Sequence, residues 1–148
     1  MAACAGGAPA SAPVADIEAS RVYAGATRAA VFERTLAAVQ AAGLHVTATD
    51  QGRGVITAGR RGFRDDRGWA SCPRQLVAPR DDTRRVRLAE PLERDLRLTA
   101  SIREGPGGPA VGLATAIVER QRNSFTNLTF LERCRSTGAL ERRILQAV

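Results

Sequence analysis

The chain has 148 residues, of which 44% are hydrophobic, so it suits one domain with a real core and wholesale disorder is excluded. It contains no run of about 18 apolar residues, so no membrane-spanning helix is expected. Aromatic residues make up only 4%, too few for the stacking platforms of a typical single-strand nucleic-acid binder.

The formal net charge is +7, and every basic residue is Arg. No run of five like charges occurs, so a basic nucleic-acid tail is not expected. Most Arg residues alternate with apolar residues along predicted strands. This pattern is typical of a solvated sheet face and favours that interpretation over a phosphate-binding groove.

Residues 1–20 are rich in Ala, Gly, Pro and Ser, which predicts a flexible tether ahead of a folded domain over 21–148. Small residues come directly before Cys4. The tether and this Cys together resemble the end of a bacterial lipoprotein signal, in which Cys4 would carry the lipid. The charged and apolar regions of a secretory signal are missing from the sequence, and the alternative is an Ala-rich N-terminus with an incidental Cys.

The first half of the domain is predicted as strand, helix, strand, strand. A short strand over 21–24 precedes Thr27, whose hydroxyl suits a helix N-cap. Residues 28–42 are mostly good helix formers with apolar residues on one face. Gly43 then provides the left-handed residue that ends many helices.

Two alternating segments, 44–49 and 55–58, are predicted to pair through a Gly-containing turn. Residues 60–83 follow as a long irregular stretch interrupted by Gly and Pro. A loop of this length in a compact domain is usually functional, disordered or pinned by another part of the chain.

Strands are predicted to resume at 85–88, and the clearest hairpin joins 96–103 to 110–121. Ser136 or Thr137 suits the N-cap of a final helix with Leu140, Ile144 and Val148 on one face. The predicted fold is α+β, with a single antiparallel sheet packed by two helices in the order β-α-β-β-β-β-β-α.

If Cys4 is a lipid anchor, two of the three cysteines remain, Cys72 and Cys134. An even number of remaining cysteines in an exported domain favours a disulfide between them. The bridge would staple the long irregular stretch to the C-terminal helix and contribute about 4 kcal/mol. One alternative is a pair of buried reduced thiols in a cytosolic protein. A zinc site is less favoured, because there is no C-x-x-C motif and His45 lies on the outward register of its strand.

Segments 31–58 and 134–145 resemble small proteobacterial envelope lipoproteins. The first contains an alanine-rich helix, a Gly, a strand and then Asp, three residues, Gly-Val-Ile-Thr-Ala. Related helix-over-sheet domains occur in BamC, a lipoprotein of the outer-membrane barrel-assembly machinery. The resemblance implies a periplasmic location, anchored to the outer membrane, but it brings no catalytic residue and no function by itself.

No catalytic, metal or cofactor site is expected, so the chain is predicted not to be an enzyme. His45 has no obvious Ser partner for a hydrolase triad. The pairs Asp65-Asp66 and Asp81-Asp82 could bind a cation or act as acid and base. Asp residues in polar loops more often form turns, and each pair has its own Arg. A small enzyme that uses these pairs stays a third hypothesis.

Phe63 and Trp69 either complete the core or form an exposed patch for a partner, and with Arg64 and Arg74 they are the candidate partner-contact residues. The favoured function is a non-enzymatic, lipid-anchored periplasmic domain that acts through contacts with envelope proteins. The alternative is a cytosolic, Arg-rich nucleic-acid-binding module with free thiols and salt-sensitive binding. It lacks the aromatic strand motif of RNA-recognition sheets.

Overall fold

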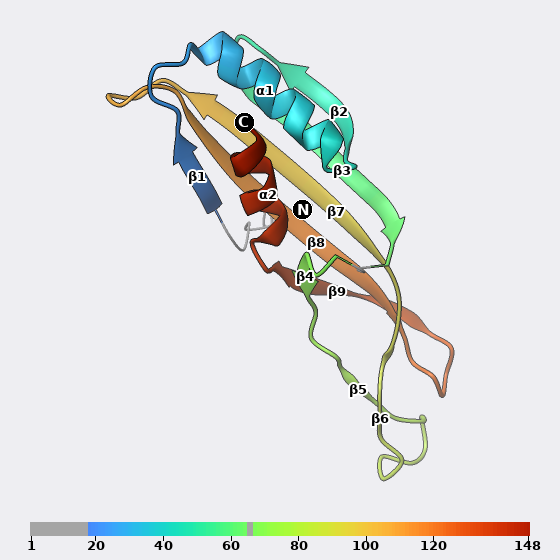
Figure 1. Cartoon of the computed structure of the whole chain (residues 1–148). Helices are drawn as coiled ribbons and strands as arrows, with labels where there is room; N and C mark the ends of the chain where they lie inside the picture. The colour runs from blue at the N-terminus through green and yellow to red at the C-terminus, as the bar shows by residue number, and fades with distance from the viewer. Residues whose placement is uncertain (1–17, 65–66) are drawn as a thin grey trace, which may run out of the picture.

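The computed structural model describes residues 18–64 and 67–148 and has the α+β fold that the sequence predicts (Figure 1). Two helices pack on one antiparallel sheet, and a small separate hairpin extends from the end of the sheet. Neither helix in this part of the chain has the length and apolarity needed to cross a bilayer. The strands of the sheet are β1 (Glu18–Val22), β2 (His45–Asp50), β3 (Val55–Phe63), β4 (Ala70–Ser71), β7 (Glu90–Arg103), β8 (Ala110–Arg122) and β9 (Thr129–Ser136). The hairpin strands are β5 (Leu76–Val77) and β6 (Arg87–Leu88), and the helices are α1 (Arg28–Ala41) and α2 (Ala139–Ala147).

The long strands β7 and β8 form the centre of the sheet. Its order is β2-β3-β7-β8-β9-β4, with β1 also paired to β8. β1 pairs with the first half of β8 and β9 with the second half, so β1 and β9 share one edge of that strand. The first three residues of β1 belong to the stretch assigned to the tether, so the sheet reaches further toward the N-terminus than predicted.

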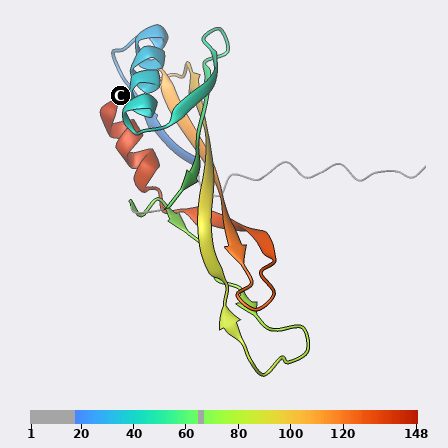
Figure 2. The same cartoon turned by 90° about the vertical axis from the view of Figure 1, so that its right-hand side faces the viewer.

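Both helices lie on the same face of the sheet, and no described helix lies on the opposite face (Figure 2). The core forms between that face and the helices, because alternate residues of β7 and β8 point toward them. Its members include Val31, Phe32, Val39, Ile56, Phe63, Trp69, Leu98, Ile102, Leu113, Ile117, Leu140 and Ile144.

The predicted ends of the first helix are confirmed. Thr27 accepts a hydrogen bond at Oγ1 from the backbone N–H of Ala30 at 3.2 Å. Gly43 has a φ of 85°, and its N–H donates to the carbonyl oxygen of Gln40 at 2.9 Å. Both signals act on nearby backbone groups, which explains why the sequence alone reveals them.

The N-cap of the final helix is Gly138, with a φ of 77°, so the prediction of Ser136 or Thr137 is wrong. Both hydroxyls still serve this helix start. Ser136 Oγ accepts from the N–H of Gly138 at 3.1 Å and donates to Glu141 at 2.7 Å. Thr137 Oγ1 accepts from the N–H of Ala139 at 3.4 Å. The glycine takes the cap position because the chain turns there through the left-handed region.

The stretch 60–83 contains more regular structure than expected. β3 continues to Phe63 beyond an irregularity in its pairing with β7, and β4 and β5 are short strands within the stretch. β9 is absent from the predicted elements. Few of its residues are buried, so its apolar alternation is weak and pairing with β8 decides its conformation.

Candidate functional site

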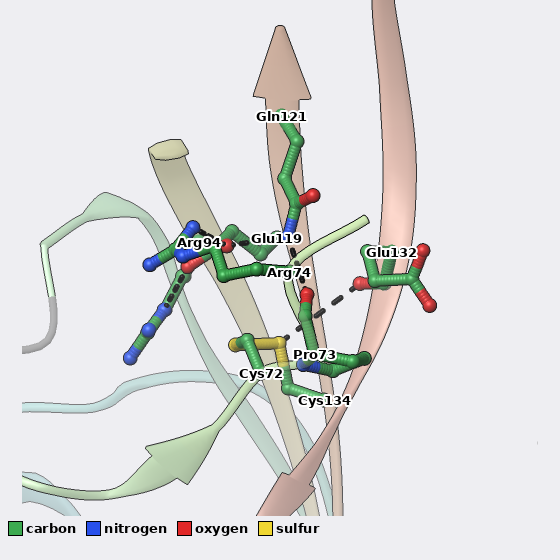
Figure 3. The surroundings of a disulfide bond; sticks show 8 residues. All are labelled: Cys72, Pro73, Arg74, Arg94, Glu119, Gln121, Glu132 and Cys134. Carbon is green, nitrogen blue, oxygen red and sulfur yellow. Dashed lines mark hydrogen bonds and ion pairs between the residues drawn. A yellow bond between two sulfur atoms is a disulfide. The ribbon is translucent and has the colours of Figure 1, made fainter. Parts of the chain in front are cut away.

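Cys72 and Cys134 form a disulfide, as the sequence predicts, with their Cα atoms 4.3 Å apart (Figure 3). β4 and β9 pair antiparallel with Ser71 opposite Arg135, and one further step in this register brings the two cysteines opposite each other. The bond therefore clamps the segment after β4 to the sheet. It reaches β9, just before the final helix, and not the helix itself as expected.

Glu119 is the centre of a buried polar cluster beside this disulfide (Figure 3). Glu119 lies on β8 and is only 1% exposed. Arg74 donates from Nη1 to Oε1 at 2.7 Å, and Arg94 donates from Nε to Oε2 at 2.7 Å. A buried carboxylate needs its charge paired and its oxygens hydrogen-bonded. The burial of Glu119 therefore depends on the segment that brings Arg74.

Gln121 also holds the segment of residues 72–74 in place through hydrogen bonds. Its side-chain Nε2 donates to Glu119 Oε1 at 2.8 Å and to the carbonyl oxygen of Pro73 at 2.8 Å. Its own Oε1 is buried without a hydrogen-bond partner among the described residues. Residues 72–74 are thus held by one covalent bond, one ion pair and one backbone contact, which makes this part of the surface well defined.

A hollow of about 390 Å³ lies beside the cluster. Three guanidinium groups contribute to its lining, and they come from parts of the chain far apart in sequence. The residues around it include Phe63, Arg64, Arg74, Leu92, Arg94 and Glu119. Glu90 and Glu119 also line the hollow, and Arg74 and Arg94 both pair with Glu119. The exposed Arg64 is therefore the lining guanidinium group best placed to meet an acidic side chain of a partner.

The structure brings three of the four candidate partner-contact residues to this hollow. Phe63, Arg64 and Arg74 line it. Trp69 packs behind Phe63, with ring centroids 6.0 Å apart, and both aromatic residues are buried. Their rings therefore belong to the core, and the exposed Arg64 is the member of the group most open to a partner.

The other candidate residues do not join this site. His45 is exposed and lies on the uncovered face of the sheet, as expected, in a hollow of about 720 Å³. Among described residues, Asp95 is the one carboxylate that lines it, and this side chain accepts the N–H of Gly62 at 2.9 Å. Asp82 likewise accepts the N–H of Arg84 at 3.0 Å in a turn. Cys4, Asp65 and Asp66 lie outside the described residues.

No group of three or more His, Cys, Asp or Glu side chains gathers at metal-binding distance within residues 18–64 and 67–148.

The sequence contains a signal for the buried cluster that the predictions above do not use. Val111, Leu113 and Ile117 occupy the inward register of β8, and the same period of two continues to Glu119 and Gln121. Polar residues at positions that should face a core indicate a buried polar site. Arg94 carries a comparable signal, because it continues the inward register of Leu96 and Leu98 on β7 and lies opposite Glu119.

No known protein family matches the sequence, and no curated protein is similar to it. The resemblance to envelope lipoproteins therefore stays a prediction.

Proposed function

We propose that the protein is a non-enzymatic domain of the bacterial cell envelope, located in the periplasm and anchored to the outer membrane through a lipid on Cys4. In this proposal it acts by contacting other envelope proteins. The contact surface is the hollow beside the Cys72–Cys134 disulfide, with Arg64 and Arg74 as the binding residues.

The disulfide is the observation that carries the proposal. Structural disulfides persist in oxidising compartments and are rare in the cytosol. This one holds Arg74 on a buried carboxylate, so its loss would leave Glu119 with weaker charge compensation. A disulfide placed next to a buried ion pair is part of the packed fold, which supports an exported protein more strongly than two nearby cysteines alone.

The chemistry of the hollow supports an acidic partner surface. The guanidinium groups lie beside the apolar side chains of Phe63 and Leu92, which together suit a carboxylate flanked by apolar atoms. The rigid attachment of residues 72–74 means that binding does not have to order this segment.

The alternative, a cytosolic nucleic-acid-binding module, has less support. Arg120 pairs with Glu93 at 2.8 Å, and Arg122 pairs with Glu90 at 2.7 Å. These pairs neutralise sheet residues that the alternative needs for phosphate contacts. Salt-sensitive retention on DNA or RNA, together with free thiols at Cys72 and Cys134, would favour the alternative.

Thiol trapping in the source bacterium tests the compartment. Cells that carry the tagged full chain are treated with an alkylating agent without reductant, fractionated and analysed by mass spectrometry. We expect the protein in the envelope fraction with Cys72 and Cys134 unmodified. A Cys4→Ser variant should no longer incorporate labelled fatty acid and should keep the Cys72–Cys134 disulfide. Alkylation of both bridge cysteines in a cytosolic protein overturns the proposal.

Site-specific photo-crosslinking in intact cells tests the contact surface. A photoreactive residue at Arg64 should give a discrete product with an envelope protein. Arg74→Ala should abolish this product. The control position is Arg53, whose side chain is 85% exposed in the turn between β2 and β3. A product of equal intensity from both positions argues against a specific surface at the hollow.

A further inference from the structure

The hairpin of β5 and β6 extends beyond the main sheet, at the end of the molecule away from both helices (Figures 1 and 2). Leu76 lies opposite Leu88, and Val77 lies opposite Arg87. Each of these pairs projects from one side of the hairpin, because side chains alternate along a strand. The hairpin therefore has two chemically different sides.

One side packs against the connection between β8 and β9. Val77 is buried, and the guanidinium groups of Arg85 and Arg87 lie 5.8 and 4.8 Å from the ring centre of Phe125. The Asn123 side chain donates to the carbonyl oxygen of Ala78 at 3.3 Å. These contacts fix which way the hairpin faces.

The other side is apolar and open to solvent. Leu76 is 71% exposed and Leu88 is 59% exposed, although they form a cross-strand pair. Val86 lies between Arg85 and Arg87 in the sequence, so its side chain projects to the opposite side from these two, and it is 47% exposed. We name Leu76, Val86 and Leu88 the hairpin face. Clustered exposed aliphatic side chains indicate a surface that is covered in the working state.

Residues 75–88 carry a net charge of +2, from four Arg and two Asp residues. Arg85 and Arg87 lie on Phe125 at the other side, so the loop residues Arg80 and Arg84 are the cations beside the hairpin face. The Arg84 side chain is 97% exposed, and Arg80 is also exposed. An apolar surface with cationic neighbours is complementary to a bilayer that contains anionic phospholipid, because the phosphates attract Arg while the acyl boundary accepts Leu and Val.

We propose that the hairpin face docks on an anionic phospholipid bilayer. Leu76, Val86 and Leu88 enter the boundary between headgroups and acyl chains, and Arg80 and Arg84 contact lipid phosphates. A bilayer fits better than a protein partner, because a stable protein interface takes about 800 Å² from each side and is usually centred on aromatic or Arg anchors. A narrow hairpin with three aliphatic side chains offers too little area and no aromatic anchor, whereas a lipid surface requires no matching shape.

This docking does not depend on a lipid at Cys4 or on the hollow beside the disulfide. It is tested on the full chain produced without lipidation and with the disulfide intact. The protein is mixed with vesicles of phosphatidylcholine alone or with added phosphatidylglycerol, and flotation in a density gradient measures the bound fraction. We expect binding to the vesicles that contain phosphatidylglycerol and little binding to phosphatidylcholine alone.

Matched variants separate the hairpin face from general adsorption. The double variant Leu76→Ser and Leu88→Ser should lower the partition coefficient at least about tenfold. Leu131→Ser, at a residue 67% exposed on β9, should leave it unchanged. Arg80→Gln with Arg84→Gln should lower it by about tenfold, and Arg53→Gln should not. Circular dichroism confirms that every variant is folded.

A fluorescent reporter gives an independent readout. A Leu88→Trp variant should shift its emission to shorter wavelength on vesicles that contain phosphatidylglycerol, and a Leu131→Trp variant should not. Three results overturn the proposal: no vesicle binding by the unmodified chain, equal binding to both lipid compositions, or equal losses in the hairpin and control variants. A failure of the thiol-trapping experiment leaves these measurements unaffected.

Discussion

Glu119 shows at the residue scale how one buried side chain links stability to the candidate contact surface. Glu119→Gln should lower the free energy of unfolding by about 3 kcal/mol, because Arg94, whose side chain is 13% exposed, loses its buried counter-charge. The matched control is Glu93→Gln. Glu93 pairs with Arg120 at the surface, so its loss should cost less than about 1 kcal/mol. Urea unfolding measures both, and equal losses contradict the assignment.

Tyr23 is the one tyrosine of the chain, so its titration is observed directly. Its hydroxyl donates to the carbonyl oxygen of Leu145 at 2.6 Å. Burial raises the pKa of Tyr23 above the ordinary value of 10.0, while nearby Arg21 lowers it. The neutral form therefore contributes stability that is complete below the unfolded pKa and is lost as pH rises through the folded one. Phenolate absorbance should give a higher midpoint in the native protein than in urea; identical midpoints refute this.

At the scale of the element, the turn between β2 and β3 depends on Gly54. Its φ is 70°, and its carbonyl oxygen accepts the N–H of Ile102 at 2.7 Å. A Cβ at this position would lie 2.3 Å from the carbonyl oxygen of Ile102. Gly54→Ala should therefore cost about 3 kcal/mol through left-handed strain and overpacking together.

Gly25→Ala measures the cost of the left-handed backbone alone, without a close contact such as the one at Gly54. Gly25 has a φ of 76°, but nothing lies within 4 Å of the position that an added methyl group would take. This variant should cost only about 1 kcal/mol. Thermal or urea unfolding compares the two. If both variants lower the free energy of unfolding by the same amount, the close approach of Gly54 to Ile102 on β7 does not explain the need for glycine there.

At the scale of the whole molecule, the disulfide joins two positions separated by 62 residues. The double variant Cys72→Ser and Cys134→Ser should lower the free energy of unfolding by about 4 kcal/mol, because the unfolded chain regains the entropy of that loop. Urea unfolding with and without reductant measures the effect. Reductant should destabilise the unmodified chain and leave the double variant unchanged, and an unmodified chain insensitive to reductant contradicts the prediction.

Much of the fold follows from local signals in the sequence. Thr27 and Gly43 mark the ends of α1, and alternation predicts the β7–β8 hairpin. The short β9 lacks such a signal, because its residues carry little apolar alternation. The buried cluster is also hard to predict, although Glu119 continues the inward register of β8, since a charged residue on a strand usually indicates a solvated face.

The sequence by itself determined the α+β class, the main helix and the hairpin, and it favoured a bond between the two later cysteines on the condition that Cys4 is a lipid anchor. These depend on capping, period and cysteine parity, which act between neighbours or need only a count. Only the tertiary structure decided that the bridge reaches β9, that Arg74 and Arg94 converge on Glu119, and that Leu76 and Leu88 stay exposed. Such contacts join residues far apart in the chain, and their geometry depends on the register of the whole sheet.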